Sequence, residues 1–363
     1  MDEKSVVEQI LELGRWAPSG DNNQYWRFER LEPMSVRVHG FDSRSDCVYD
    51  LDGHPSQISL GALLETIEIA ASVHGLAVQV VRDAHAAETL PIFDLTFVAS
   101  PGLKPSSLAS VIEKRSVQRR PFSTRPLTAN EKQALSDAAA PTHTVHWIEG
   151  FGQRLQAAKL MFHSAKLRLT IPEAYVVHKK IIQWNAQFSK DRIPDQALGA
   201  SWGTLMMMRR VMESWERVHF FNRFLAGTWA PRIELDFIPG LMCAAHFALC
   251  AKSPPQDIDD YVAAGRAVQR FWLTATHLGL QLQPEVTPLI FARYAKNNVT
   301  FSTFPGTTQR AETVGRRLRD LLGTDVARNA VFLGRIGKGS SPKARSLRMN
   351  LQELTYDPGK RPR

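Results

Sequence analysis

The sequence predicts a mixed α+β protein, and three observations support that fold class. Two long, apolar helices are expected at residues 58–75 and 258–279. Short apolar or alternating runs are expected to form strands at residues 26–30, 35–40, 77–81, 92–99, 241–252 and 331–337. The chain has 363 residues, of which 44% are hydrophobic and 22% charged, so it is long enough for two domains or two fused halves.

The N-terminal part is expected to begin with a helix and to continue into paired strands. Residues 4–15 have an amphipathic pattern, and Pro18 ends that helix. The apolar face of the helix is expected to carry Val6, Ile10 and Leu13. The runs 26–30 and 35–40 are expected to pair with each other, and Gly75 closes the long helix that follows.

A connector rich in Gly, Pro and Ser at residues 101–107 separates this part from the rest of the chain. A helix is expected over residues 108–115 after the connector. A second helix is expected over residues 126–139, because Thr128 and Glu131 have the spacing of a capping box. The helical pattern therefore restarts after the connector.

The middle and the end of the chain are less regular. Residues 151–226 are expected to be helical with irregular spacing, and the polar tail after Leu354 is expected to fray. Several large side chains of the middle segment either belong to the core or form a roof over an aromatic ligand: Trp202, Met206, Met207, Met208, Met212 and Trp215.

Two passages of the chain are similar to each other. The sequence of residues 61–79 is GALLETIEIAASVHGLAVQ, and that of residues 265–283 is GRAVQRFWLTATHLGLQLQ. Both begin with Gly, continue for about four helical turns and end in a His and Gly-Leu before an extended segment. Their similarity indicates either an internal duplication or two unrelated helices rich in Ala.

The bulk composition limits the classes of partner. The net charge of +9 and the pI near 9.6 suggest a nucleic acid, a membrane surface or a phosphorylated ligand. The sequence shows no basic face with interleaved aromatic residues, and no apolar run is long enough to span a bilayer. The three cysteines have neither CxxC nor metal-ligand spacing, so we expect a cytoplasmic protein without a metal site.

Three polar stretches could carry chemistry: residues 18–26, 114–122 and 334–348. The second and third stretches combine several cations with Gly or Pro. A phosphate monoester needs two or more charge-assisted hydrogen bonds, for which the planar fork of Arg is well suited. Solvated surface turns remain the alternative interpretation of these stretches. The sequence GRIGKGSSPK is not a P-loop, because the GK[ST] ending is absent.

Taken together, the three stretches resemble motifs of the nitroreductase-like FMN-binding family. RWAPSGDNNQYWRF is similar to the family signature in which a helix ends in Ala-x-x-Ala-Pro-Ser-x-x-Asn-x-Gln-Pro-Trp. KRSVQRRPF resembles the family's Arg-Arg-Ser-x-Arg-x-Phe element, and VFLGRIGKGSSPKARSLR resembles its C-terminal strand and Arg-rich segment. The central sequences IPGLMCAAHFALCAK and GRAVQRFWLTATHLGLQLQPE are also similar to the family, so the resemblance covers most of the chain.

The order of the motifs resembles that of a fused, double-length subgroup, the Acg-type and ThiF-associated nitroreductase-like proteins. In this chain the Ala-Pro-Ser turn comes before the Arg-Ser element. The resemblance implies two fused halves that form an intramolecular pseudo-dimer, each with a mainly antiparallel sheet packed with helices. Residues 1–107 would form the first half, and residues 108–363 the second half, which carries the phosphate-binding elements. The resemblance also implies a single FMN site between the two halves.

The resemblance assigns roles at the phosphate end of that site. Arg115 and Ser116 would contact the ribityl phosphate, and Lys343 and Arg345 would close on it from the C-terminal segment. Gln118 stands where the family usually has Arg or Lys, which weakens one phosphate contact, and Arg119 or Arg120 could compensate for it.

The resemblance also assigns roles at the flavin ring. The residues that would contact the ring from the first half are Pro18, Ser19, Gly20 and Asn22. Backbone groups of Pro284 and Glu285 would lie against the isoalloxazine. Tyr25 replaces the proline that usually precedes Trp26, which is the one misfit in the turn.

The function implied is that of an FMN-dependent oxidoreductase, which transfers hydride or electrons through flavin N5. NAD(P)H would be the reductant, and the acceptor would be a nitro compound, a quinone or a biosynthetic intermediate. Because the cofactor carries the chemistry, no catalytic side chain is assigned. A ThiF-type enzyme is the expected partner, and a further homodimer is compatible with the resemblance. The alternative is a protein that binds or sequesters flavin with little turnover.

Overall fold

The N-terminal part of the protein contains a four-stranded antiparallel sheet. The computed structural model describes residues 5–225 and 227–359. The strands of this sheet are β1 (Trp26–Glu32), β2 (Ser35–Gly40), β3 (Leu76–Arg82) and β4 (Ile92–Ala99). Their spatial order is β1-β2-β4-β3, and every neighbouring pair is antiparallel.

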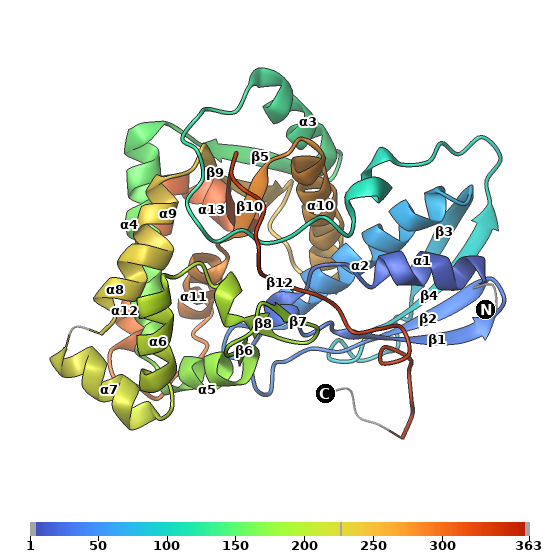
Figure 1. Cartoon of the computed structure of the whole chain (residues 1–363). Helices are drawn as coiled ribbons and strands as arrows, with labels where there is room; N and C mark the ends of the chain where they lie inside the picture. Colours follow the sequence, from blue (N-terminus) through green and yellow to red (C-terminus); the bar gives the residue numbers. More distant parts are fainter. Residues whose placement is uncertain (1–4, 226, 360–363) are drawn as a thin grey trace.

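A second four-stranded antiparallel sheet is built from residues far along the chain. Its strands are β5 (His143–Ile148), β9 (Ala245–Ala251), β10 (Gln281–Pro284) and β11 (Ala330–Gly337). The spatial order is β10-β11-β9-β5. All side chains of β11 are buried, as expected for a central strand that is covered on both faces. The two sheets lie on opposite sides of the molecule (Figure 1). The predicted α+β class with antiparallel sheets is confirmed.

The two sheets share one order of elements along the chain. In the first part, α1 (Val6–Gly14) precedes β1 and β2, and α2 (His54–Ser72) precedes β3 and β4. In the second part, α3 (Ala129–Ala139) precedes β5, and α10 (Ile258–His277) lies between β9 and β10. The spatial order β3-β4-β2-β1 therefore corresponds to β10-β11-β9-β5, element for element.

The two long helices α2 and α10 cross between the sheets at two glycines (Figure 1). A Cβ atom on Gly61 would lie 2.0 Å from the carbonyl oxygen of Val262. A Cβ atom on Gly265 would lie 2.0 Å from the carbonyl oxygen of Ile58. No side chain fits at either position, so the helix backbones are in direct contact. These glycines are the first residues of the two similar passages.

The polar contacts between α2 and α10 are reciprocal, like the contacts of the two glycines. Glu65 of α2 accepts a hydrogen bond of 2.8 Å from Arg270 of α10. Gln269 of α10 donates a hydrogen bond of 2.8 Å to Thr66 of α2. When Gly61 is aligned with Gly265, Glu65 aligns with Gln269 and Thr66 with Arg270. The two bonds are therefore counterparts of each other, as at a self-complementary interface.

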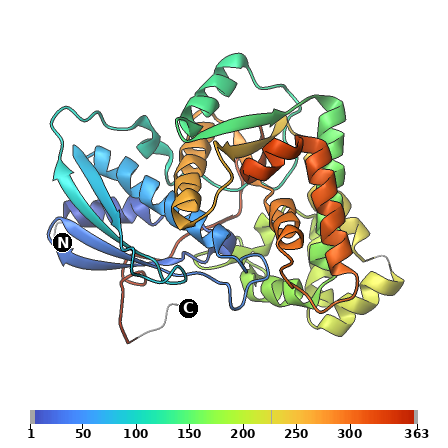
Figure 2. The same ribbon diagram turned by 180° about the vertical axis from the view of Figure 1, so that it is seen from behind.

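A long helical segment is inserted between β5 and β9. Its helices are α4 (Gly150–Leu169), α5 (Pro172–Ile181), α6 (Trp202–Val211), α7 (Trp215–Phe224), α8 (Trp229–Arg232), the π-helix Ile233–Phe237 and α9 (Ile238–Leu241). The short strands β6 (Ile182–Gln183), β7 (Phe188–Ser189) and β8 (Ile193–Pro194) interrupt it, so the prediction of a helical stretch over residues 151–226 was only partly right. Between β10 and β11 the chain forms α11 (Thr287–Lys296), α12 (Thr307–Leu322) and α13 (Thr324–Asn329). Helix α12 packs beside α4 (Figure 2).

The C-terminal segment returns from the second sheet to the first (Figure 1). Its strand β12 (Arg345–Ser346) pairs in parallel with β7. Further on, Thr355 bridges to Phe28 at the edge of β1, and the ring of Tyr356 stacks on His39 at 3.6 Å. The prediction that the tail frays after Leu354 was wrong for the described residues, because the tail covers a sheet edge.

Local signals predicted most other elements. Thr128 caps α3, and both hydrogen bonds of its capping box with Glu131 are present. The expected helix over residues 108–115 is instead a 3-10 turn over Ser107–Val111. The predicted buried face of α1 was right at Ile10 but wrong at Val6, which is 40% exposed, whereas Val7 and Leu11 are buried. No helix among residues 5–225 and 227–359 is long and apolar enough to cross a membrane.

The helix crossing predicts a strong effect of small substitutions. We expect Gly61→Ala and Gly265→Ala each to lower the free energy of unfolding by about 1–3 kcal/mol or more, because the added methyl must separate two backbones. Chemical denaturation measures this change. Gly152→Ala on α4 is the matched control, since a Cβ there meets no atom within 4 Å. Equal stability of the Gly61 variant and the control would contradict the close crossing.

Candidate functional site

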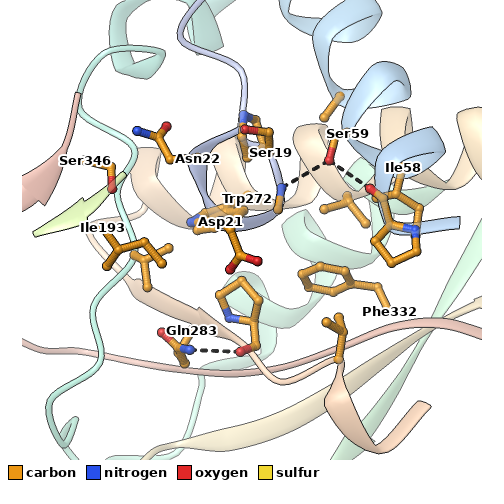
Figure 3. Close-up of a pocket in the computed structure, with 18 of the residues that line it drawn as sticks. Ser19, Asp21, Asn22, Ile58, Ser59, Ile193, Trp272, Gln283, Phe332 and Ser346 are labelled. Carbon is orange, nitrogen blue, oxygen red and sulfur yellow. Dashed lines mark hydrogen bonds between the residues drawn. The ribbon is translucent and has the colours of Figure 1, made fainter. Parts of the chain in front are cut away.

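A cavity of about 290 Å³ lies where the two long helices, the first turn of the chain and the end of β10 meet. Its apolar walls include Ile58 of α2, Val268 and Trp272 of α10, and Phe332 of β11. The close-up in Figure 3 shows polar side chains of the first turn on one side of the cavity and Phe332 and Gln283 on the other. A planar apolar ligand with polar edges fits this arrangement.

The turn at residues 18–22 forms one wall, and its backbone has an unusual shape. Asp21 and Asn22 have φ angles of 53° and 64°, a left-handed conformation that Asp and Asn tolerate better than most residues. The backbone N–H of Gly20 donates to the Ser59 hydroxyl at 3.3 Å, which fixes the turn to α2 (Figure 3). Behind the turn, Trp26 is fully buried and acts as an anchor in the core.

Three arginines meet at one end of the cavity: Arg115, Arg345 and Arg348. Arg115 donates to the carbonyl oxygen of Trp16 at 3.1 Å, and Arg345 donates to that of Glu113 at 2.7 Å. Arg348 donates to the carbonyl oxygen of Ala17 at 2.9 Å and to the side chain of Asn22 at 2.9 Å.

The partners of these guanidinium groups are all neutral. Among the described residues none of the three forms an ion pair with a carboxylate. The Nε atoms of Arg115 and Arg345 are buried and have no hydrogen-bond partner in the described structure. This end of the cavity therefore contains positive charge and free donors that no carboxylate of the described residues pairs with, although the charge of Glu113 acts on Arg345 from a longer distance.

The pKa values of the clustered arginines are lowered, as expected for buried cations that lie close together. Burial, followed by the nearby charges of Arg348 and Arg345, holds the pKa of Arg115 well below its ordinary value. Burial also lowers the pKa of Arg348 to about 9, and the charges of Arg345 and Arg15 contribute. Buried cations are normally paired. An anion bound among these arginines would remove their mutual repulsion.

The structure brings together most of the residues that the sequence predicted for the site. The predicted residues that line this cavity are Pro18, Ser19, Gly20, Asn22, Arg115, Ser116, Pro284 and Arg345. They come from both ends of the chain and from its middle. Their common location follows from the helix crossing and from the returning C-terminal segment.

Three predicted residues lie outside this cavity. Gln118 and Lys343 line a neighbouring one, where the Gln118 amide donates to the carbonyl oxygen of Ser340 at 2.7 Å. The side chain of Glu285 lines a third cavity. The backbone N–H of Glu285 donates to Leu333 at 2.8 Å, so this donor is engaged within the protein.

Three residues that line the cavity were given no role from the sequence: Asp21, Trp272 and Arg348. Arg119, which could compensate for Gln118, also lines the cavity. Arg348 ends the basic segment that was noticed, and Asp21 lies inside the predicted turn. Trp272 belongs to an apolar helix pattern that gives no sign of a role in binding. In the structure the guanidinium of Arg115 lies over the Trp272 ring, 4.6 Å from the ring centre. A sequence pattern does not show which of several neighbouring cations is buried.

Asp21 is the acidic residue that lines the cavity. Figure 3 shows its carboxylate pointing into the cavity, and this carboxylate accepts no hydrogen bond from the part of the chain that the structure describes. Burial raises the pKa of Asp21 to about 6, although the positive charge of Arg119 acts in the opposite direction. This carboxyl group therefore exchanges a proton near neutral pH. No cluster of three or more metal-ligating side chains occurs in the described ranges.

Comparisons with known proteins give only distant similarities. No protein-family model and no curated protein matches the sequence. A nitroreductase-like family protein from Bacillus cereus has 14% identity and a TM-score of 0.33, and the match covers 70% of this chain and 97% of that chain. A nitroreductase with bound FMN from Bacteroides fragilis NCTC 9343 has 11% identity and a TM-score of 0.32, with coverages of 65% and 89%. The FMN-dependent nitroreductase NfnB from Mycobacterium smegmatis, in complex with NADPH, has 15% identity and a TM-score of 0.38, with coverages of 69% and 97%. Similarities this distant assign neither a cofactor nor an activity to this protein.

The raised pKa of Asp21 predicts a pH-dependent stability. Between about pH 4 and pH 6 the folded protein keeps a proton that the unfolded chain has lost, so the free energy of unfolding falls as the pH rises through this window. Asp21→Asn cannot ionise. We expect this variant to be more stable than the wild type at pH 7 by roughly 2–3 kcal/mol, and equally stable below about pH 4. Denaturation curves at several pH values measure the difference, and a constant difference at all pH values would contradict the assignment.

Proposed function

We propose that the protein binds FMN in this cavity and acts as an FMN-dependent oxidoreductase of the nitroreductase-like kind. The observation that carries the proposal is the cluster of Arg115, Arg345 and Arg348 at the cavity. These arginines form no ion pair with an acidic side chain among the described residues, and the cavity beside them has apolar walls. A phosphate monoester carries close to two negative charges at pH 7 and accepts several hydrogen bonds. FMN combines such a phosphate with a planar, apolar ring system.

The residues present fit that cofactor. The unpartnered Nε atoms of Arg115 and Arg345, together with Arg348 and the Ser116 hydroxyl, would hold the phosphate. Trp272, Phe332 and Pro284 would enclose the ring system. The turn at residues 18–22 would supply polar groups to the ring edge. Gln118 and Lys343 line the neighbouring cavity, and phosphate binding by these two residues stays a prediction.

We further propose that the site is formed by two fused nitroreductase-like halves, residues 1–107 and 108–363, that make an intramolecular pseudo-dimer. The shared order of elements and the exchanged contacts of α2 and α10 support this interpretation. The Ala-Pro-Ser turn occurs in the first half, whereas the Arg-Ser element with Arg115 occurs in the second. Each half therefore contributes one wall, and one chain would hold one cofactor.

When bound, FMN supplies the redox chemistry by passing a hydride or electrons from a donor to an acceptor. The protein binds and orients the cofactor, and the walls of the cavity exclude water. Asp21 would hold a proton close to the reacting ring, because its carboxyl is aimed into the cavity and titrates near neutral pH. By resemblance, NAD(P)H is the proposed donor and a nitro compound, a quinone or a biosynthetic intermediate the proposed acceptor. A ThiF-type partner and a further homodimer also stay proposals.

The absorbance spectrum of the purified protein tests the function directly. We expect a yellow protein with flavin absorbance, or one that takes up added FMN, whose flavin is bleached by NADPH or NADH under anaerobic conditions. A bound flavin that both reductants leave oxidised would favour the alternative of a flavin-sequestering protein. A colourless protein that fails to take up FMN would refute the proposal.

The arginine cluster predicts a specific loss of affinity. We expect Arg345→Ala to weaken FMN binding by roughly 1.5–3 kcal/mol, the range for a hydrogen bond to a charged group. Arg345→Lys should recover part of this loss, because it restores the charge without the planar fork. Fluorescence titration of FMN measures both effects. Arg328→Ala, at a side chain 52% exposed on α13, is the control and should bind FMN like the wild type. Unchanged affinity in the Arg345→Ala variant would show that the phosphate lies elsewhere.

A further inference from the structure

Strand β3 lies at an open edge of the first sheet (Figure 1). Two other sheet edges are covered. Phe28 of β1 forms two backbone hydrogen bonds of 2.8 Å with the C-terminal segment, and the backbone N–H of Gln118 donates to the carbonyl oxygen of Leu282 of β10 at 3.2 Å. At the fourth edge, α3 packs beside β5. The outer side of β3 makes no backbone hydrogen bond with any other described segment.

The backbone groups that point outward from β3 follow from its pairing with β4. Ser100 donates to the carbonyl oxygen of Gly75 at 3.0 Å, and Asp83 donates to that of Ile92 at 2.9 Å. Both pairs fit the regular register of β3 and β4, in which bonded and non-bonded residue pairs alternate. The odd-numbered residues of β3 therefore bond to β4. The even-numbered residues point their N–H and C=O groups away from the sheet: Leu76, Val78, Val80 and Arg82.

The sequence of this edge lacks the usual protection against pairing. Soluble proteins commonly protect open edge strands with charged residues, proline or a bulge. The strand has the sequence LAVQVVR, its register with β4 is unbroken, and its only charged residue, Arg82, is engaged with Asp259 at 2.8 Å. Val81 is 65% exposed, and Val78 and Val80 are only half-buried against the core. This edge can therefore receive another strand.

The strand β3 is complementary to a second copy of itself. When two β3 strands are placed antiparallel with Gln79 opposite Gln79, Val78 of each copy lies opposite Val80 of the other. Leu76 likewise lies opposite Arg82. These are the residues whose backbone groups point outward, so each such pair can exchange two N–H···O bonds. A twofold axis through the Gln79 pair repeats every contact on its other side.

The side chains also match in this register. Val78 and Val80 of both copies would meet on the core side of the sheet and would complete their burial. Val81 would lie beside Ala77 of the second copy on the outer side, next to the two facing Gln79 amides. No two like charges lie opposite each other within the strand. A strand of an unrelated protein would have to supply these matches separately, whereas a second copy supplies them by symmetry.

We propose that β3 is an association surface at which two copies of this chain pair, antiparallel, about a twofold axis at Gln79. The first sheets of the two copies would join into one continuous sheet with four strands from each copy. Because a single strand pair buries a small area, the dimer would exchange with the monomer. The surface is separate from the crossing of α2 and α10, and pairing at β3 requires no flavin. This inference is therefore independent of the proposed function.

Sedimentation velocity of the full-length protein over roughly 1–300 µM tests the proposal, since this range covers weak association. We expect the sedimentation coefficient to rise with concentration from that of a monomer toward that of a dimer, with or without added FMN. A monomer at every concentration would overturn the proposal.

A charge swap at the twofold axis identifies the interface. Gln79→Lys and Gln79→Glu each place two like charges opposite each other, and each should weaken dimer formation by about three- to tenfold. A mixture of the two variants should dimerise at least as tightly as the wild type, because opposite charges then meet. The matched control is Thr96→Lys, at an exposed residue that lies opposite Gln79 on the β4 side, and it should dimerise like the wild type.

The charge swap can also overturn the proposal. Unchanged dimer formation in both Gln79 variants would place the contact elsewhere on the molecule. A loss that the mixture does not reverse would exclude the register in which the two Gln79 side chains face each other.

Amide hydrogen exchange at single-residue resolution gives an independent readout. The N–H groups of Gln79 and Val81 bond to β4, so we expect them to be protected at every protein concentration. Those of Val78 and Val80 point outward and should become protected only as the dimer forms. Exchange at Val78 and Val80 that does not change with concentration, in a sample that dimerises, would contradict pairing at this edge.

Discussion

The contact on which the rest of the structure depends is the crossing of α2 and α10. Two helix backbones come so close that only glycine fits at Gly61 and Gly265. Around this crossing, Ile258, Val262 and Leu273 of α10 join the apolar core that also contains α1, β1 and β2. The two parts of the chain are therefore held in one relative position. That position brings the turn at residues 18–22 and the segment around Arg115 to the same cavity.

The arginines at this cavity differ from the buried arginines that form ion pairs. Arg168 is paired with Asp236 and Arg293 with Asp52. Arg115, Arg345 and Arg348 have only backbone carbonyls and one amide as partners among the described residues. Such uncompensated charge costs stability, and proteins tolerate that cost at sites that bind a ligand.

The sequence predicted those features that depend on neighbouring residues. The capping box of Thr128 and Glu131 and the hairpin of β1 and β2 are local, and both were correct. Most of the residues that the motifs indicated also line the cavity, including Arg115 and Arg345. Pairing of Thr355 with Phe28 joins the two ends of the chain, and no local pattern contains that information.

The same limit applies inside the site. Arg348 and Lys343 lie in one basic segment, and only the fold decides that Arg348 enters the cavity while Lys343 lines its neighbour.

The proposed single FMN site between the two halves of one chain is tested by the stoichiometry of FMN binding at a known oligomeric state. We expect one FMN per 363-residue chain, also in the monomer. Two FMN molecules per chain, or binding that requires a second chain, would contradict it.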